Sequence, residues 1–250
     1  MGKLAGKVSI VTGGSRGIGR GICLEMAKEG STVVINYLSH SSEAESLLQE
    51  VKSLGGNGII VKADVSEKDQ IDGLIKQVIE HYGRIDILVN NAGICPFRNF
   101  FDIDLETWDK TINVNLRGIF LCSQAAANYM VDKKEGSIIN ISSVTAFKGG
   151  PKQVHYAASK GGVDSLTTSM ANALGEYGIR VNAILCGGIP TDINKWMFDE
   201  KELMDEKNQL SPNRVGKPED IGKAVVYLSS NDSSWVTGAL IPVDGGTFVK

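Results

Sequence analysis

The stretch Val8–Gly19, VSIVTGGSRGIG, decides the fold of this chain. It begins with a short β-branched run, which predicts a buried first strand over Val8–Thr12. Glycines follow the strand, and an amphipathic helix is expected from about Ile18 to Glu29. A strand, a glycine-rich turn and a helix N-terminus form the context in which backbone N–H groups cradle a phosphate. The loop residues expected to hold a nucleotide cofactor are Gly13, Ser15, Arg16, Gly17, Ile18 and Gly19.

Strand-like apolar runs alternate with helical patterns along the rest of the chain. Such alternation predicts right-handed crossovers and a parallel sheet that helices cover on both faces. We expect a doubly wound seven-stranded Rossmann fold, an α/β/α sandwich in three layers, as one domain over residues 1–250 with a lid insertion at about 191–214. Further strands are expected at Thr32–Tyr37, Gly58–Lys62, Ile85–Val89, Ser137–Ile141, Arg180–Leu185 and Ala239–Val243. Further helices are expected at Ser42–Leu54, Lys68–Tyr82, Leu105–Met130 and Gln153–Tyr177, and from Pro218 onward.

The composition bears on partners and location. The 250 residues carry a net charge of -3, so no basic field favours nucleic acid. No apolar stretch approaches the roughly 18 residues of a membrane span, and no signal-peptide pattern precedes the first strand. Four cysteines stand apart without a Cys-x-x-Cys pair, which suits a reducing cytoplasm without disulfides or a metal site. We therefore expect a cytoplasmic protein that binds a small molecule.

The end of the second strand bears on the choice of cofactor. A carboxylate there would bind the ribose 2′-hydroxyl of NAD and repel a 2′-phosphate, but this chain has Asn36. Arg16 could pair with a 2′-phosphate, so NADP is favoured and NAD is the alternative. In the plainer interpretation Arg16 is solvated and Asn36 simply ends a strand. Later strand ends contribute the cofactor contacts Asp64, Val65, Asn90, Ala92 and Gly93, and near Asp64 a helix N-cap role is equally open.

Tyr156 and Lys160 stand four residues apart, which places both side chains on one face of a helix. An ammonium near a phenol favours the phenolate and lowers its pKa from about 10. Ser143 follows an apolar strand and could hold the oxygen atom with which Tyr156 exchanges a proton. Taken alone, such a Tyr-x-x-x-Lys pair is common surface chemistry.

Asn115 is a polar residue inside an apolar helical run. A buried amide must find hydrogen bonds. It either caps its own backbone or holds a water molecule in a proton path.

Several motifs stand in one order: TGGSRGIG at Thr12–Gly19, NNAG at Asn90–Gly93, NVNLRG around Asn115, NISSV around Ser143, Tyr156 with Lys160, and VDGG at Val243–Gly246. In these motifs the chain resembles the short-chain dehydrogenase/reductase family over nearly its whole length. The resemblance implies that Tyr156 is the catalytic acid/base and that Lys160 binds the nicotinamide ribose and lowers the tyrosine pKa. It implies that Ser143 holds the substrate oxygen and that Asn115 anchors a relay water. It also implies cofactor contacts at Ile189 and Thr191 and a homotetramer.

One departure from the family pattern lies after the sixth predicted strand. This chain has Cys186-Gly187-Gly188 where the family usually has Pro-Gly. Loss of proline frees φ and restores an N–H group, which puts the local loop shape in doubt. Cys186 itself is expected to be a small buried filler.

Several fragments resemble sugar 1-dehydrogenases, particularly those that oxidise L-rhamnose. They are NAGICPF, GGPKQVHY, ALGEYGIRVNAIL, TDIN and DGGTFV. Polar side chains at the expected pocket suit a ring of hydroxyls, because unmet hydrogen bonds in a dry pocket are costly. Alternatively, these residues face solvent on loops. The expected substrate contacts are Cys95, Ser143, Thr145, Gln153, Tyr156 and Asn194.

Two other functions stay open. A 3-oxoacyl-[acyl-carrier-protein] reductase, or a general carbonyl reductase, shares all the catalytic motifs. An acidic carrier would require a basic entrance, which Lys148, Lys152 and Lys195 could supply, whereas Glu200, Glu202, Asp205 and Glu206 oppose it. The chain could also be a nucleotide-binding regulator without catalysis, although a sensor has no physical need for the full set of four catalytic residues.

Overall fold

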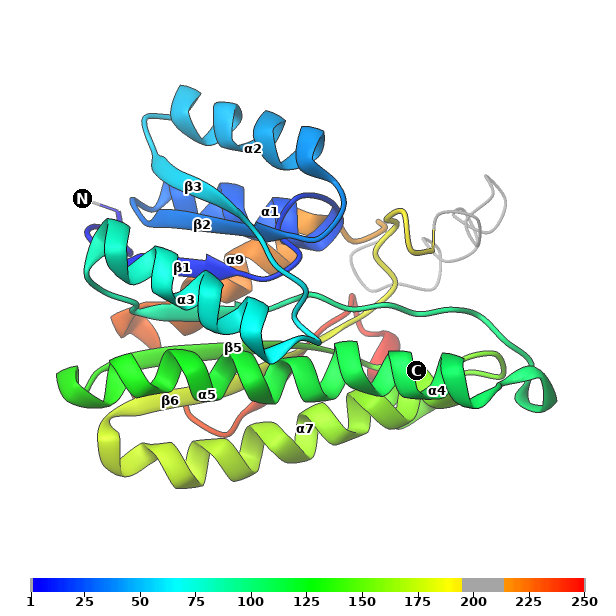
Figure 1. The fold of residues 1–250 in the computed structure, drawn as a ribbon. Coiled ribbons are helices and arrows are strands. Elements are labelled where there is room, and N and C mark those ends of the chain that lie inside the picture. The colour runs from blue at the N-terminus through cyan, green and yellow to red at the C-terminus, as the bar shows by residue number, and fades with distance from the viewer. Residues whose placement is uncertain (1, 195–213, 250) are drawn as a thin grey trace.

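The structure, a computed structural model, describes residues 2–194 and 214–249. One sheet of seven parallel strands runs through it in the order β3-β2-β1-β4-β5-β6-β7, which confirms the predicted doubly wound fold (Figure 1). The strands are β1 Val8–Val11, β2 Thr32–Tyr37, β3 Asn57–Lys62, β4 Ile87–Asn90, β5 Gly136–Ser143, β6 Ile179–Cys186 and β7 Leu240–Val243. No helix within the described ranges is long and apolar enough to cross a membrane.

Helices cover both faces of the sheet. The larger ones are α1 Gly17–Lys28, α2 Ser41–Ser53, α3 Lys68–Tyr82, α4 Leu105–Ile112, α5 Gly118–Met130, α7 Val154–Leu174 and α9 Pro218–Ser229. Shorter segments are η1 Phe100–Asp102, the π-helical η2 Asn113–Arg117, η3 Val131–Lys133, α6 Thr145–Lys148, η4 Gly175–Tyr177, η6 Asn231–Ser233 and η7 Thr247–Val249. One apolar core lies under α1, α2 and α9, and the other lies under α3, α5 and α7.

Most predicted elements form within one or two residues of their expected ends, but the single helix expected over Leu105–Met130 is wrong in detail. It consists of α4, η2 and α5, and the backbone stays in the αR region through both junctions. The wider π turn holds Asn115, which is fully buried. Of the lid expected at about 191–214, residues 195–213 lie outside the described ranges, and with them Lys195, Glu200, Glu202, Asp205 and Glu206.

The central strands carry polar side chains on the face that α5 and α7 cover. Asn90 Nδ2 donates to Ser123 Oγ on α5 and to Asn140 Oδ1 on β5, both at 2.9 Å. Asn140 in turn donates to Thr167 Oγ1 on α7, also at 2.9 Å. Alternation along β5 sends Ile139 and Ile141 to the other core. This buried network joins two helices to the middle of the sheet.

Helix α1, which carries the glycine loop, packs closely against α9 because both helices have glycine at the crossing. A Cβ atom added to Gly21 would lie 2.5 Å from Cβ of Pro218, and one added to Gly222 would lie 2.8 Å from the carbonyl oxygen of Gly21. In contrast, a Cβ added to Gly73 in α3 would meet no atom within 4 Å.

These two glycines give a matched prediction for stability. We expect Gly21→Ala to lower the free energy of unfolding by roughly 1 to 3 kcal/mol, because the methyl group overpacks the α1–α9 contact. Gly73→Ala should raise it by roughly 0.5 to 1 kcal/mol, because alanine stabilises a helix interior relative to glycine and its methyl group would meet open space here. Denaturant unfolding of both variants measures the difference, and equal effects would contradict this packing.

Candidate active site

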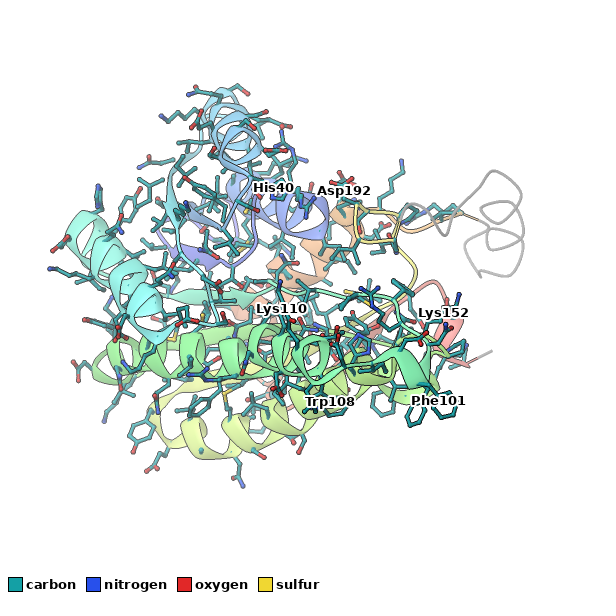
Figure 2. All side chains as sticks on the ribbon, turned by 45° about the vertical axis from the view of Figure 1, so that its right-hand side comes forward. His40, Phe101, Trp108, Lys110, Lys152 and Asp192 are labelled. Atoms are coloured by element: carbon teal, nitrogen blue, oxygen red, sulfur yellow. The ribbon has the colours of Figure 1, made fainter. Side chains whose placement is uncertain are left out.

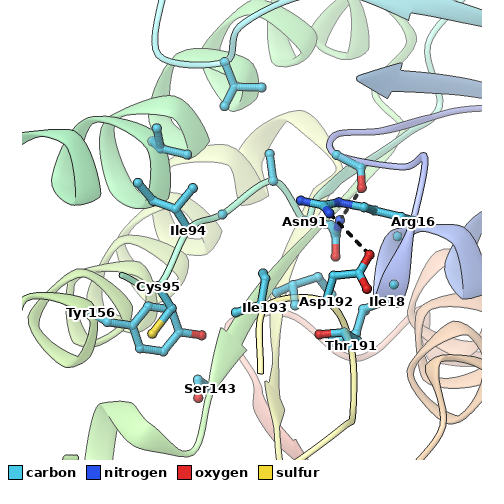
Figure 3. Close-up of a pocket in the computed structure, with 18 of the residues that line it drawn as sticks. Arg16, Ile18, Asn91, Ile94, Cys95, Ser143, Tyr156, Thr191, Asp192 and Ile193 are labelled. Atoms are coloured by element: carbon cyan, nitrogen blue, oxygen red, sulfur yellow. Dashed lines mark hydrogen bonds and ion pairs between the residues drawn. The ribbon is translucent and has the colours of Figure 1, made fainter. Parts of the chain in front are cut away.

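A cleft of about 960 Å³ opens along the carboxyl ends of the strands. At one end it is lined by the glycine loop between β1 and α1, and at the other by Tyr156, Ser143 and Cys95. Figure 3 shows these groups together, with Arg16 and Asp192 across the cleft from the tyrosine. Open parallel sheets bind ligands outside the carboxyl ends of their strands, so the cleft lies where the fold predicts a ligand site.

Thr12 and Asn91 lock the glycine loop to the end of β4. Thr12 Oγ1 accepts hydrogen bonds from the backbone N–H groups of Asn91, at 2.9 Å, and Ala92, at 3.0 Å. Asn91 Nδ2 donates to the carbonyl oxygens of Thr12 and Gly13. Neither side chain was among the predicted site residues, although both lie inside the quoted motifs.

The loop has the shape of a phosphate cradle. Gly13 and Gly17 have φ of 59° and 54°, where glycine is favoured. A Cβ on Gly13 would lie 2.9 Å from Cα of Ala92, so the close backbone approach requires glycine there. The N-cap of α1 has no side-chain hydrogen bond, and its first turn holds no acidic residue. The first N–H groups of the helix therefore lack side-chain caps, and the site fits the diphosphate of a dinucleotide.

Asn36 lines the cleft, and its side chain is bonded to the glycine loop and to the end of β3. Its Oδ1 accepts from the Gly13 N–H at 3.2 Å, and its Nδ2 donates to the carbonyl oxygens of Val61 and Ala63. The next residues, Tyr37 to His40, bring no carboxylate to this part of the cleft. Arg16 Nη1 lies 3.3 Å from Asp192 Oδ2, and both side chains are nearly half exposed.

Three other predicted cofactor residues, Asp64, Val65 and Asn90, do not all lie at the cleft. Asp64 and Val65 line the cleft, and one Asp64 oxygen accepts hydrogen bonds from the backbone N–H and the hydroxyl of Ser66. Asn90, in contrast, does not line the cleft, because its side chain points into the sheet interior toward Ser123 and Asn140. The remaining predicted contacts at Ser15, Ile18, Gly19, Ala92, Gly93, Ile189 and Thr191 also lie along the cleft.

The predicted catalytic groups meet at the other end. Ser143 is the last residue of β5, and Tyr156 lies in the first turn of α7. Ser143 Oγ accepts from the Thr145 N–H at 3.1 Å, which leaves its own proton for the tyrosine or a ligand. The Lys160 side chain is buried, with Nζ 5.6 Å from the Tyr156 ring centre and 2.7 Å from the carbonyl oxygen of Ile141.

The electrostatics differ from the sequence-based expectation that Lys160 lowers the tyrosine pKa. Burial raises the pKa of Tyr156 well above its ordinary value, and nearby Cys95 adds to the rise, while a hydrogen bond from Ser143 opposes it. Burial also lowers the pKa of Lys160 to about 8. The net shift of the Tyr156 pKa is upward because loss of water penalises the phenolate just as it penalises the ammonium, and the two groups share one dry environment.

Asn115 does not line the cleft and acts from beneath it. Its Oδ1 accepts from the Ile94 N–H at 2.8 Å, and its Nδ2 donates to the Ile94 carbonyl oxygen at 2.9 Å and to Ser159 Oγ at 3.1 Å. The side chain thus neither caps its own backbone nor points at the cleft. It ties the loop after β4 to α7, one residue before Lys160.

The predicted substrate residues also differ in whether their side chains are available to a ligand. Thr145, Gln153 and Cys95 line the cleft, and Gln153 Nε2 donates to Cys95 Sγ at 3.2 Å. Asn194 borders the cleft too, but its amide is used within its own loop. Its Oδ1 accepts from the N–H and hydroxyl of Thr191, and its Nδ2 donates to the Ile189 carbonyl oxygen. Asn194 therefore shapes the cleft wall.

Cys186 stands where the family usually has proline. β6 extends through Cys186, which pairs with Ser143 on one side and Val243 on the other. Its side chain is buried, as expected for a small filler. A Cβ on Gly187 would lie 2.6 Å from Cα of Asp244, so the close approach of the two backbone segments requires glycine there. Unlike proline, cysteine keeps its N–H, which lets the strand run one residue beyond its predicted end.

Comparison with known proteins agrees with this geometry. A family model described as Enoyl-(Acyl carrier protein) reductase matches residues 13–247. L-rhamnose 1-dehydrogenase (NAD(P)(+)) of Azotobacter vinelandii is 44% identical, with 99% of this chain and 98% of that protein covered. The 3-oxoacyl-[acyl-carrier-protein] reductase FabG of Staphylococcus aureus is 39% identical, with 97% and 98% covered. The crystal structure of a putative short-chain alcohol dehydrogenase from Sinorhizobium meliloti superimposes with a TM-score of 0.92 at 34% identity, with 99% and 98% covered. This chain belongs to the short-chain dehydrogenase/reductase family of oxidoreductases.

Proposed function

We propose that this protein is an NAD(P)-dependent sugar dehydrogenase that oxidises the anomeric carbon of an aldose to a lactone. One observation carries the reaction class: the Tyr156 and Ser143 hydroxyls lie at the floor of the same cleft that the glycine cradle lines. In this reaction the hydrogen on C1 leaves with both electrons of the C1–H bond, as a hydride. A base takes the proton of the C1 hydroxyl, and the C1–O bond becomes the carbonyl of the lactone. The bound nicotinamide supplies the hydride acceptor.

The side chains of the cleft carry out the proton transfer and hold the substrate and the cofactor. Tyr156 takes the proton of the C1 hydroxyl, and Ser143 donates a hydrogen bond to the same oxygen. Lys160 supports the phenolate by its positive charge and would also hold the nicotinamide ribose. Asn115 fixes the backbone of Ile94, which walls the cleft beside Cys95. The glycine loop would bind the diphosphate, and Arg16 would reach a 2′-phosphate.

The choice of an aldose rests on the relatives and on the polar groups at the reacting end. L-rhamnose 1-dehydrogenases match nearly the whole chain at 41–44% identity. Gln153 and Thr145 add hydrogen-bonding groups beside Ser143. The runner-up is reduction of a 3-oxoacyl thioester, because a relative of that name is 39% identical. Of its expected basic entrance, Lys148 is bonded to the Thr247 carbonyl oxygen, Lys152 is exposed and Lys195 lies outside the described ranges (Figure 2).

A homotetramer and a cytoplasmic location remain expectations from the sequence. For self-association, the supporting feature is a set of exposed apolar side chains on η1 and α4 (Figure 2). Phe101 is 95% exposed and Leu105 is 78% exposed. An exposed apolar patch often marks a protein–protein contact.

The first prediction about the reaction concerns Tyr156. We expect Tyr156→Phe to lower kcat by roughly 100- to 10,000-fold, because the ring is kept and the proton-exchanging hydroxyl is lost. Cofactor binding, followed by fluorescence titration, should persist. The matched control is Tyr129→Phe on the exposed surface of α5. A rate near that of the unaltered protein would exclude Tyr156 as the acid/base.

The second prediction concerns the cofactor. We expect NADP to be preferred and Arg16→Leu to lower kcat/KM for NADP roughly 10- to 100-fold, the value of a charge-assisted hydrogen bond, with little change for NAD. The exposed Arg16–Asp192 ion pair contributes little to stability, so a bound 2′-phosphate should replace Asp192 as the partner of Arg16. Arg20→Leu, one turn further along α1, is the control. If the unaltered protein has a far higher kcat/KM with NAD, the proposed preference is wrong.

The third prediction separates the two substrates. Formation of reduced cofactor is followed with NADP or NAD and a panel of aldoses that includes L-rhamnose. Oxidation of reduced cofactor is followed in parallel with a 3-oxoacyl thioester. We expect the higher kcat/KM with an aldose. Turnover of the thioester with no signal from any sugar would favour the reductase, and no turnover with either would favour a binding protein.

A further inference from the structure

A buried carboxylate lies one helical turn beyond Lys160. Asp164 is 5% exposed, and Lys160 is 4% exposed. Their spacing of four residues along α7 puts both side chains on one face, with Tyr156 one turn before the lysine. A buried charge is costly unless something compensates it. None of the roles given above uses Asp164, so its position calls for an explanation.

The Asp164 carboxylate interacts with Ser142 and Lys160. Neither of its carboxylate oxygens makes a hydrogen bond of regular geometry with another described residue. Burial raises the pKa of Asp164, whereas the Ser142 hydroxyl on β5 and the Lys160 ammonium lower it. Ser142 is itself buried, and its Oγ lies 3.5 Å from the carbonyl oxygen of Lys160. The carboxylate, the serine and the lysine thus form one dry cluster between α7 and the sheet.

The surroundings of Lys160 show why a carboxylate matters there. Burial lowers the pKa of Lys160 to about 8, so its positive charge is marginal above neutral pH. Cys186 on β6 and Cys95 after β4 also face the lysine. Burial raises the pKa of Cys186 to about 12 and raises that of Cys95, so both thiols are neutral near pH 7. Tyr156 is neutral for the same reason, which leaves Asp164, within residues 2–194 and 214–249, as the carboxylate that favours the charged lysine.

We propose that Asp164 is a positioning residue whose negative charge keeps Lys160 protonated, so that Lys160 can support the phenolate of Tyr156. The inference rests on the proposed function and extends it by one residue. Opposite charges attract more strongly in a dry interior than in water, and salt screens buried pairs only weakly. Asp164 therefore acts on the reaction through Lys160 and does not itself contact the cleft.

The direct test measures the ionisation of Lys160 without substrate or cofactor. Protein labelled with ¹³C at lysine Cε is titrated by NMR, and the Lys160 signal is identified by its loss in Lys160→Arg. We expect Asp164→Asn, which keeps the side-chain shape but removes the charge, to lower the Lys160 pKa by about one pH unit. Glu176→Gln, on the exposed η4 that follows the same helix, should leave it unchanged. An unchanged Lys160 pKa in Asp164→Asn overturns the proposal.

Further variants keep the test decisive if Asp164→Asn does not fold. Asp164→Ser is smaller and uncharged and should also lower the Lys160 pKa, whereas Asp164→Glu restores the charge and should return it toward the original value. If the Lys160 pKa does not change with the charge at position 164 in these variants, the proposal is contradicted.

The second readout is the pH profile of kcat/KM. We expect its alkaline limb to move to lower pH in Asp164→Asn by the same amount as the Lys160 pKa, with near-equal rates well below that pKa. A loss that is uniform at all pH values would mean a structural role and would refute the assignment. If the unaltered protein turns over no aldose, the proposed function fails, while the NMR titration still decides the role of Asp164.

Discussion

Parallel pairing places the carboxyl ends of β1, β4 and β5 side by side, and the whole cleft depends on that edge. The edge is held by short polar contacts, chiefly those of Thr12 with the backbone after β4. Ser143 ends β5 on the same edge, and α7 returns over it with Tyr156 and Lys160. Distant parts of the chain therefore meet at one site because the strand order brings them there.

Burial is the second physical constraint, and it opposes the proposed chemistry. A dry floor makes hydrogen bonds to a substrate oxygen stronger, but it also disfavours the phenolate and the ammonium. The shifts of Tyr156 and Lys160 in opposite directions show this cost. Other charges in the same dry environment must offset the free-energy cost of ionising these two side chains. Polar side chains on the α7 side of β5 also affect these charges. One of them is Ser142, whose hydroxyl lowers the pKa of Asp164.

The sequence was sufficient for the fold, because β-branched runs and glycine turns mark the strands without tertiary information. Most of the residues singled out from the sequence also lie along one cleft, with exceptions that share a cause. Asn90 was expected at the cofactor, Asn194 at the substrate and Asn115 at a relay water, yet each amide is bonded to neighbouring backbone or side chains. Side-chain direction depends on register and on the π turn, which local patterns do not encode. Likewise, the pKa of Tyr156 depends on burial, which spacing alone does not give.

The central claim is that the nicotinamide site and the tyrosine hydroxyl serve the same atom of the substrate. A crystal structure of the protein with oxidised cofactor and a slowly reacting aldose tests this most directly. We expect the C1 oxygen of the sugar to lie within roughly 2.6–3.2 Å of both Tyr156 Oη and Ser143 Oγ, with C1 facing the nicotinamide. A sugar oxygen out of reach of Tyr156, or a cofactor bound away from the glycine loop, would contradict it.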